Sequence, residues 1–213
     1  MAERIQRRLP VGAEVQPGGG VHFRVWAPRR RKVTIVVEPP AGSGAFDPRR
    51  VALTAEPDGY YSVHVAEAVA GSRYHFLLDE DEYRYPDPTS RFQPQGVHRP
   101  SEVIDPAAFA WHDADWPGVE LHGPILYELH IGTFTPQGTF AAAIEKLPLL
   151  ADAGVTLIEV MPVADFDGEY GWGYDGVCWF APTRLYGRPD DFRRFVDEAH
   201  RLGMGVILDV VYN

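Results

Sequence analysis

Residues 162–188 bring aromatic rings, carboxylates and glycines together in one stretch. The aromatic members are Phe166, Tyr170, Trp172, Tyr174, Trp179, Phe180 and Tyr186, and the acidic ones are Asp165, Asp167, Glu169 and Asp175. Three glycines surround Trp172 and Tyr174, and glycine lets the backbone carry a ring close to a ligand. We therefore expect these two rings to be exposed at a site for sugars, whose apolar faces and hydroxyl groups suit rings and carboxylates. Trp179 and Phe180 are expected to fill core behind the loop.

The segment Gly171–Gly176 matches the glycine pattern of dinucleotide-binding loops, G-x-G-x-x-G. It neither follows a predicted strand directly nor opens a helix, and aromatic rings fill positions where a phosphate must approach the backbone. We therefore reject a nucleotide site there. Asp165–Glu169 has the composition of a calcium loop but lacks the ligand spacing of an EF-hand, so a solvated acidic loop is the better interpretation. The sequence predicts no metal site.

Further candidate site residues follow apolar runs directly. His130 lies near the end of one run, Asp209 follows another, and Asn213 comes four residues later. A carboxylate buried after such a run is costly unless it is paired, so Asp209 is expected to form a buried ion pair, to organise a site, or to do both. His130 is either a ligand group or a core histidine, and the sequence leaves both interpretations open.

Three apolar runs alternate with two amphipathic helices in the second half of the chain. The runs are Ile125–Ile131, Val155–Met161 and Gly205–Asn213, and helical spacing covers Thr139–Ala153 and Asp190–Leu202. This alternation is typical of parallel strands joined by helical crossovers, and near-continuous apolar strands indicate a sheet covered on both faces. Because such sheets bind ligands at the strand carboxyl ends, we expect Tyr174, Asp209 and Asn213 to converge there, with Trp172 nearby.

Local signals predict how the two helices begin and bend. Thr139 precedes the first helical stripe and is expected to cap it, since its hydroxyl accepts from a free N–H of the first turn. Pro148 is expected to kink that helix. Asp190 and Asp191 stand at the start of the second helix, where the macrodipole favours acidic side chains.

Short strands without a helical period fill the first half of the chain. The predicted strands are Val21–Trp26, Lys32–Glu38, Val51–Thr54, Tyr60–Val65, Ser72–Leu78 and Tyr83–Tyr85. Pro57-Asp58-Gly59 is a hairpin signal, because proline presets one turn position and glycine supplies positive φ. We therefore predict an immunoglobulin-like β-sandwich over residues 1–105, a connector over 106–123 and the parallel unit over 124–213. The connector's two tryptophans are expected to pack against a domain face.

Composition limits the classes of partner. The formal net charge is −10, and residues 1–110 hold equal numbers of acidic and basic side chains, so the excess lies in residues 111–213. An acidic surface disfavours nucleic acid and anionic membranes. The only cysteine is Cys178, which fits a reducing compartment. With no signal peptide at the N-terminus and no run of ~20 apolar residues, the sequence predicts a cytoplasmic protein with neither nucleic-acid nor membrane partners.

Several motifs resemble one enzyme family. Leu208–Asn213 resembles the first conserved stretch of the α-amylase family, glycoside hydrolase family 13, which has the pattern D-x-x-x-N-H at the end of its third barrel strand. Tyr127–Thr135, Trp172–Gly176 and Asp87–Phe92 are similar to the branch that contains the malto-oligosyltrehalose trehalohydrolases. Phe23–Pro28 resembles the sandwich domain that precedes the barrel in isoamylases, branching enzymes and trehalohydrolases.

The resemblance implies a β-sandwich followed by the first three strands and two helices of a (β/α)8 TIM barrel. It places Tyr174 against the sugar ring next to the scissile bond, gives Asp209 the task of holding an arginine and the nucleophile region, and lets Asn213 brace the strand end. It assigns no role to His130. The family cleaves with retention through two carboxyl groups. The resemblance places the family's catalytic carboxylates after the fourth, fifth and seventh strands, so no catalytic residue is expected in this chain.

The resemblance therefore implies the N-terminal part of a glycosidase that hydrolyses the α-1,4 bond next to the trehalose end of maltooligosyl trehalose, releasing trehalose without a cofactor. The chain alone is expected to be inactive. An isoamylase or a glycogen branching enzyme is the alternative within the class, with other α-glucan oligosaccharides as substrates. A non-catalytic carbohydrate-binding protein is the alternative from another class, although the predicted sandwich has no evident aromatic platform. The oligomeric state stays open.

Overall fold

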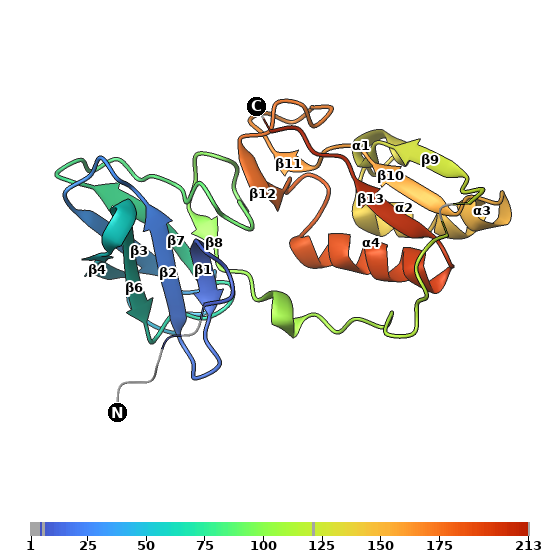
Figure 1. Ribbon diagram of the computed structural model, residues 1–213. Helices are drawn as coiled ribbons and strands as arrows, with labels where there is room; N and C mark the ends of the chain where they lie inside the picture. Colours follow the sequence, from blue (N-terminus) through green and yellow to red (C-terminus); the bar gives the residue numbers. More distant parts are fainter. Residues whose placement is uncertain (1–4, 6, 121, 213) are drawn as a thin grey trace. The chain divides into compact units, whose positions relative to one another are not determined.

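The computed structural model describes residues 5, 7–120 and 122–212, and the chain divides into two compact units, Met1–Pro106 and Ala107–Asn213 (Figure 1). Each unit has a hydrophobic core of its own. The segment predicted as a connector belongs, from Ala107 onward, to the second unit. Among the described residues, no helix combines the length and the apolar character that crossing a membrane requires.

The first unit consists of two antiparallel sheets. Their strands are β1 (Gly12–Val15), β2 (Val21–Trp26), β3 (Val33–Glu38), β4 (Arg49–Ala52), β5 (Thr54–Ala55), β6 (Tyr60–Val65), β7 (Arg73–Leu78) and β8 (Ser101–Glu102). One sheet has the order β1-β2-β6-β5 and the other the order β4-β3-β7-β8, which confirms the predicted sandwich (Figure 1).

The sandwich core arises from the alternation seen in the sequence. Val21, Phe23 and Val25 of β2 are buried between the sheets, and Phe23 meets Tyr74 of β7 edge to face with ring centroids 4.9 Å apart. Rings in this geometry add to the stabilisation that burial of their apolar surface provides. Trp26, the last residue of β2, is 59% exposed.

Some strand predictions for this unit differ from the structure. Tyr83–Tyr85 is not a strand, because only Tyr85 forms a bridge, to Phe76. The predicted strand Val51–Thr54 is divided: β4 pairs with β3, β5 pairs with β6, and the chain changes sheet at Leu53. The turn Pro57–Gly59 joins β5 to β6, so the hairpin prediction is confirmed. β1 and β8 are too short to show a period in the sequence.

Two buried histidines make the sandwich sensitive to acid. Burial, helped by the charge of Arg7, lowers the pKa of His22 to about 4, and burial with the charge of Arg84 lowers the pKa of His75 to about 4. In the unfolded chain both groups titrate near 6.5. A lowered histidine pKa stabilises the fold above pH 6.5, and this contribution is lost as the pH falls from 6.5 towards 4.

We therefore expect the free energy of unfolding to fall by on the order of 2–3 kcal/mol for each histidine between pH 7 and pH 4. Urea denaturation of residues 1–106, with Trp26 as fluorescent reporter, measures it. His75→Phe is expected to remove about half of the pH dependence. A free energy of unfolding that is constant from pH 7 to pH 4.5 would contradict the prediction.

The second unit alternates strands and helices. Its elements are β9 (Leu126–Leu129), α1 (Ile131–Phe134), α2 (Phe140–Ile144), α3 (Leu147–Asp152), β10 (Leu157–Val160), β11 (Ala164–Asp165), β12 (Cys178–Pro182), α4 (Pro189–Arg201) and β13 (Gly205–Leu208). β9, β10 and β13 form a parallel sheet in the order β13-β10-β9, in which Leu157 lies opposite both Leu126 and Gly205. The predicted parallel arrangement is confirmed.

The helix predicted over Thr139–Ala153 is two helices rather than one kinked helix. Thr139 caps α2, accepting a hydrogen bond from the Ala142 N–H at 3.2 Å, as expected. α2 ends at Ile144, and α3 starts at Leu147 with Pro148 in its first turn. Proline has no N–H for the carbonyl four residues earlier, and its ring crowds that carbonyl, so the first helix stops and a new one begins.

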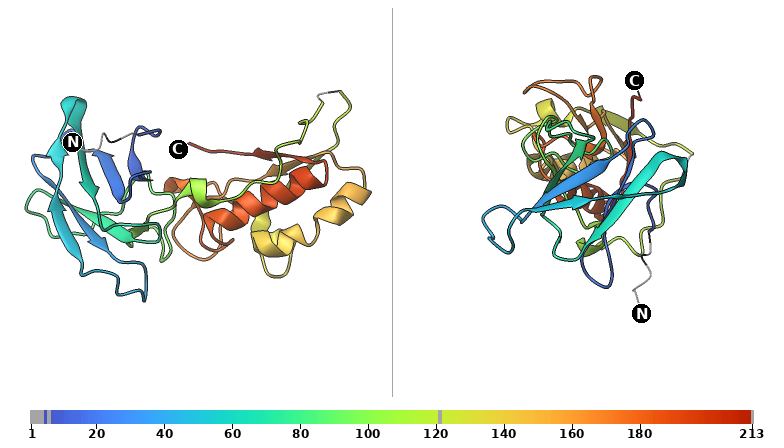
Figure 2. Two further views of the ribbon diagram at one scale, coloured as in Figure 1. Left: turned by 90° about the horizontal axis from the view of Figure 1, so that it is seen from below. Right: turned by 90° about the vertical axis from the view of Figure 1, so that its left-hand side faces the viewer.

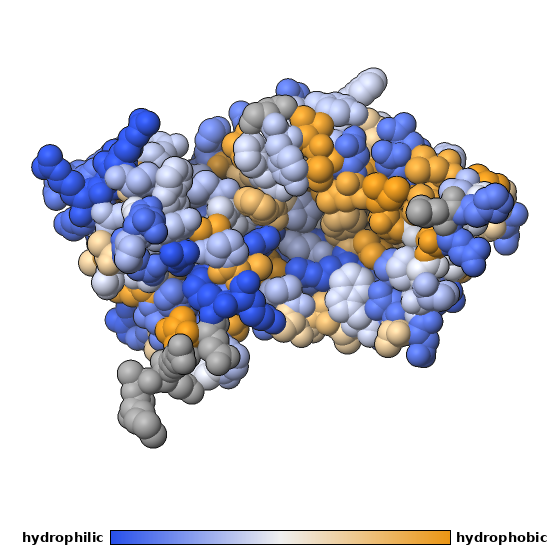
Figure 3. Space-filling view, viewed as in Figure 1, coloured by the Kyte–Doolittle hydropathy of each residue, from blue (hydrophilic) through white to orange (hydrophobic). Residues whose placement is uncertain are grey.

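The helices cover one face of the three-stranded sheet (Figure 2). Phe140, Leu147 and Phe195 are buried against Ile158 and Val160 in this layer. On the opposite face Val119 packs against Gly205, but large apolar side chains stay exposed, so the prediction of a sheet covered on both faces is wrong for these residues. Exposed apolar side chains there and along the sheet edges form the patch seen in Figure 3; they include Ile125, Leu126, Tyr127, Ile207 and Leu208.

Self-association of the 213-residue chain is the expected consequence of this patch. An open sheet with unpaired edge strands and an exposed apolar face pairs readily with other chains. The mean mass measured by light scattering is expected to rise with protein concentration, and the double substitution Leu126→Lys, Ile207→Lys is expected to reduce that rise. Val69→Lys, at an exposed apolar position of the sandwich, is the matched control. A monomer at every concentration would contradict the prediction.

Residues 112–116 pack against α4 through hydrogen bonds and a ring stack. His112 binds Asp197 through its main-chain N–H and through Nδ1, both at 2.8 Å, and Nδ1 of His200 lies 2.7 Å from an Asp113 carboxylate oxygen. Trp116 stacks on His200 with ring centroids 3.6 Å apart. The packing expected of the connector tryptophans is therefore confirmed for Trp116.

Candidate functional site

The carboxyl end of β10 holds two of the predicted site segments. The Asp209 N–H donates to the Val160 carbonyl at 2.9 Å, which places the end of β13 beside the end of β10. Gly173 lies against Pro162: a Cβ on Gly173 would stand 2.0 Å from the Pro162 carbonyl oxygen. The φ angle of Gly173 is +94°. Glycine is required there for both reasons. The loop before Tyr174 and the start of the segment after β13 thus reach the same strand end.

The two loop rings are exposed, as expected. The exposed fraction is 74% for Trp172 and 41% for Tyr174. Asp209 is partly exposed and forms no ion pair among the described residues, so the buried-ion-pair interpretation is wrong within the described chain. The physical reason is that β13 ends at Leu208, so Asp209 lies just beyond the strand, where its side chain stays partly exposed. Asn213, the remaining predicted site residue, lies outside the described residues.

Asp165 anchors the base of the loop. Its side chain is fully buried and receives a hydrogen bond from Arg184 Nη1 at 3.2 Å, while Arg184 Nη2 donates to the Gly168 carbonyl at 3.3 Å. Burial raises the pKa of Asp165 above its usual range, against the opposing charge of Arg184. The interpretation as a solvated acidic loop therefore holds for Asp167 and Glu169, which are exposed, and is wrong for Asp165.

The long loop contains a two-stranded sheet that the sequence did not predict, since its strands are short and separated by irregular chain. β11 pairs with β12 in antiparallel fashion. The expectation that Trp179 and Phe180 fill core is wrong, because both side chains are exposed in β12. Phe166 and Tyr186 are buried in their place.

His130 is a hydrogen-bonded, half-buried side chain that links three segments. Its Nε2 lies 3.0 Å from the Gly171 carbonyl oxygen and 2.8 Å from the Tyr186 hydroxyl, and its Nδ1 lies 3.1 Å from the Thr133 hydroxyl. The sequence could not predict this network, because Gly171 and Tyr186 lie 41 and 56 residues from His130 along the chain.

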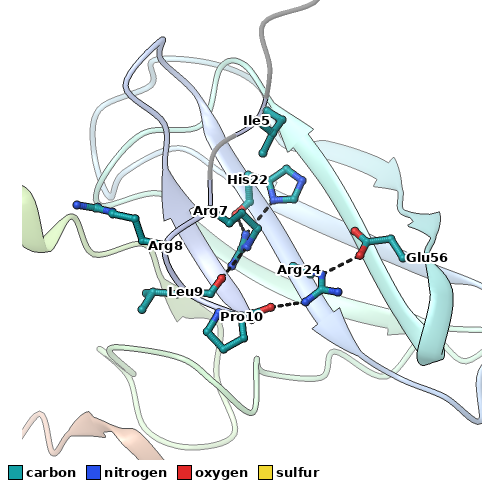
Figure 4. A pocket seen from close by; sticks show the side chains of 8 residues that line it. All are labelled: Ile5, Arg7, Arg8, Leu9, Pro10, His22, Arg24 and Glu56. Carbon is teal, nitrogen blue, oxygen red and sulfur yellow. Dashed lines mark hydrogen bonds and ion pairs between the residues drawn. The ribbon is translucent and has the colours of Figure 1, made fainter.

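A pocket in the sandwich unit is lined by side chains that form hydrogen bonds and ion pairs within the unit (Figure 4). Arg7 donates to the carbonyls of Leu9, His22 and Gly12 at 2.9–3.0 Å, and Arg24 pairs with Glu56 at 2.8 Å. The guanidinium groups hold the segment before β1 against β2, so we assign the pocket a structural task.

The sandwich also carries an exposed aromatic ring that the sequence analysis missed. Trp26 lies opposite Tyr60 of β6, and its indole N–H donates to the Asp58 carbonyl at 3.0 Å. The alternation of β2 was a signal for it, because Trp26 has the parity of the outward-facing Arg24. Within the described part of the chain, no group of three or more histidine, cysteine, aspartate or glutamate side chains is placed to hold a metal ion.

Comparison with protein-family models gives two matches. Residues 91–213 match the alpha amylase catalytic domain, and residues 10–107 match carbohydrate-binding module 48, the isoamylase N-terminal domain. The first covers more than half of the chain, and the second coincides with the sandwich. This confirms the predicted fold class.

Individual relatives agree with these matches. A malto-oligosyltrehalose trehalohydrolase from Deinococcus radiodurans is 47% identical over 97% of this chain and 32% of its own length, and one from Saccharolobus solfataricus is 46% identical over 91% and 33%. A 1,4-alpha-glucan branching enzyme from Nocardia farcinica is 32% identical over 92% of this chain and 27% of its own length.

Among solved structures, a Salmonella typhimurium protein assigned as an alpha amylase matches with a TM-score of 0.86 and 45% identity over 94% of this chain and 33% of that one. The chain spans about a third of the length of the curated relatives it matches. By the catalytic-domain match and the fold it adopts, this chain belongs to the α-amylase family.

Proposed function

We propose that this chain forms the N-terminal part of a malto-oligosyltrehalose trehalohydrolase. The enzyme hydrolyses the α-1,4 bond next to the trehalose end of maltooligosyl trehalose and releases trehalose. The observation that carries the proposal is the difference in identity between relatives: 46–47% to the trehalohydrolases from Deinococcus and Saccharolobus against 32% to the branching enzyme, over similar shares of the chain.

The geometry supports a sugar-binding role for the end of β10. Tyr174 supplies an exposed ring for the apolar face of the sugar next to the scissile bond, and Trp172 offers a second ring two residues earlier. Asp209 follows the neighbouring strand end and is proposed to hold a cationic group of the complete barrel. Asn213 is proposed to brace the end of β13.

The chemical step belongs to groups outside these residues. Retaining cleavage uses one carboxylate as nucleophile and a second carboxyl group as acid and then base. We assign neither task to an aspartate or glutamate of this chain. Its residues bind and orient the substrate, and orientation lowers the barrier because the reacting atoms are already in place.

Two other functions stay as alternatives. An isoamylase or branching enzyme uses a related barrel, and a protein that binds glucans without cleaving them is favoured by the exposed Trp26 beside Tyr60.

A segment exchange tests the proposal. Residues 1–213 replace the corresponding segment of the Deinococcus trehalohydrolase, and the same residues replace that of the Nocardia branching enzyme as the matched control. We expect the first chimaera to release trehalose with a kcat/KM within about tenfold of the parent enzyme, because the segment completes the substrate site. The second chimaera is expected to form few branches.

The opposite ranking of the two chimaeras would favour the branching enzyme. Binding of maltooligosaccharides without cleavage by either chimaera would favour the non-catalytic alternative.

A further inference from the structure

The loop that carries Trp172 and Tyr174 is held at one carbonyl group. The Gly171 carbonyl oxygen lies 3.0 Å from His130 Nε2 and 3.4 Å from the Tyr186 hydroxyl, and these two polar atoms are 2.8 Å apart. His130 follows β9, and Tyr186 precedes α4. His130, 41 residues before Gly171, and Tyr186, 15 residues after it, therefore meet at the residue immediately before Trp172.

The chemistry of these groups assigns the hydrogens. A carbonyl oxygen only accepts, so Nε2 of His130 carries the hydrogen and donates it to Gly171. Nδ1 is then an acceptor, and the Thr133 hydroxyl at 3.1 Å donates to it. The one hydrogen on Nε2 is shared between the Gly171 carbonyl and the Tyr186 hydroxyl oxygen, and the Tyr186 hydroxyl donates its own hydrogen to Gly171. Each polar atom of the cluster thus has a partner of the opposite kind.

Tyr186 is a rigid support for this arrangement. Its side chain is buried, and its main-chain carbonyl accepts from the Phe140 N–H at 2.9 Å. Burial raises the pKa of Tyr186 to about 12, so the hydroxyl keeps its proton at neutral pH. Gly132 lets the rings come this close, because a Cβ there would stand 2.9 Å from His130 and 3.0 Å from the Tyr186 ring.

The loop is also attached at its start and at its end. Arg184 holds Gly168 at the loop's start, and the Val177 N–H donates to the Asp165 carbonyl at its end. Gly171 packs against the Phe166 ring, and Gly173 packs against Pro162. The contacts of His130 and Tyr186 with the Gly171 carbonyl are thus a polar attachment at the residue directly before Trp172.

We propose that His130 and Tyr186 are positioning residues, which fix the Gly171 carbonyl and thereby set where the Trp172 and Tyr174 rings lie relative to the sugar. The inference rests on the proposed function, because it gives His130 a task only if these rings bind substrate. His130 acts through the loop and does not touch the sugar itself.

The test uses the chain labelled with 5-fluorotryptophan and observed by fluorine NMR. The sequence has five tryptophans, and Trp172→Phe assigns the signal of the loop. His130→Leu removes the donor, whereas His130→Gln places an amide N–H near the position of Nε2. We expect the Trp172 signal to move towards that of the unfolded chain in His130→Leu and to return in His130→Gln. Trp26, in the other unit, is the internal control.

Tyr186→Phe is a second variant, which keeps the buried ring and removes the hydroxyl. It is expected to shift the Trp172 signal in the same direction as His130→Leu but by a smaller amount, because Nε2 of His130 still donates to Gly171. An unmoved Trp172 signal in both His130→Leu and Tyr186→Phe would overturn the inference. Equal movement of all five tryptophan signals would overturn it as well, because it would indicate general loss of structure.

Activity separates this inference from the proposed function. In the Deinococcus chimaera, His130→Leu is expected to lower kcat/KM roughly tenfold, because a change of this size corresponds to the free energy of about one lost hydrogen bond. His130→Gln is expected to restore most of the lost kcat/KM. If the Trp172 signal shifts in His130→Leu while kcat/KM stays unchanged, His130 does position the loop. That result would overturn the proposed role of the loop in substrate binding.

Discussion

No turnover of maltooligosyl trehalose or of maltooligosaccharides is expected from the 213-residue chain. Retaining cleavage needs two carboxyl groups about 5 Å apart across the scissile bond. We assign neither role to the acidic residues near the end of the sheet: Asp209 is partly exposed, and Asp165 is buried against Arg184. Enzymes of this class depend on both groups, so the loss relative to a complete enzyme is the whole catalysed rate, at least ~10⁶-fold.

The assay compares the purified chain with a buffer blank and with the Deinococcus chimaera as positive control, following trehalose and reducing ends over long incubation. A second preparation carrying Asp209→Asn serves to detect a contaminating glycosidase, because contamination does not respond to that substitution. Turnover above the blank that Asp209→Asn abolishes would contradict the prediction and place catalysis within this chain.

Tyr174→Ala is expected to lower kcat/KM of the active chimaera about 30-fold. The ring loses its contact with the apolar face of the sugar, and the burial of a large side chain is worth on the order of 2 kcal/mol. Because the ring is proposed to lie next to the scissile bond, the loss is expected in kcat as well as in KM. Tyr174→Phe keeps the ring and is expected to stay within about threefold of the parent chimaera.

Tyr170→Ala is the matched control, since Tyr170 belongs to the same loop and is 94% exposed. Its kcat/KM is expected to remain unchanged within experimental error. Equal losses for Tyr170→Ala and Tyr174→Ala would indicate a general effect on the loop, and unchanged kinetics in Tyr174→Ala would remove Tyr174 from the substrate site.

Periodicity was sufficient to predict the elements that bury a continuous apolar face. The strands β2, β3, β6 and β7 and the helix α4 lie close to the expected ranges, because each repeats apolar residues at the period of its own geometry. The parallel order of β9, β10 and β13 followed from the helices between them, since a parallel strand pair requires a crossover connection. The exposure of Trp172 and Tyr174 followed from the glycines around them.

The sequence-based predictions were wrong where the burial of a side chain depends on segments that are distant along the chain. Trp179 and Phe180 were expected in the core because they are large and apolar, yet the buried positions of the loop are taken by Phe166 and Tyr186. Asp165 was expected in water, yet Arg184, 19 residues away, pairs with it in the interior. Neither outcome has a local signal, since a side chain's burial depends on what the rest of the chain places over it.

The sequence by itself determined the two-unit organisation, the strand and helix types and the resemblance to the α-amylase family, because propensity, periodicity and motifs are properties of neighbouring residues. Only the tertiary structure decided that Gly173 rests on Pro162, that Asp209 joins the end of β10, and that His130 reaches Gly171. These contacts join residues 11 to 49 positions apart, and their geometry arises from packing of the whole unit, which no local pattern records.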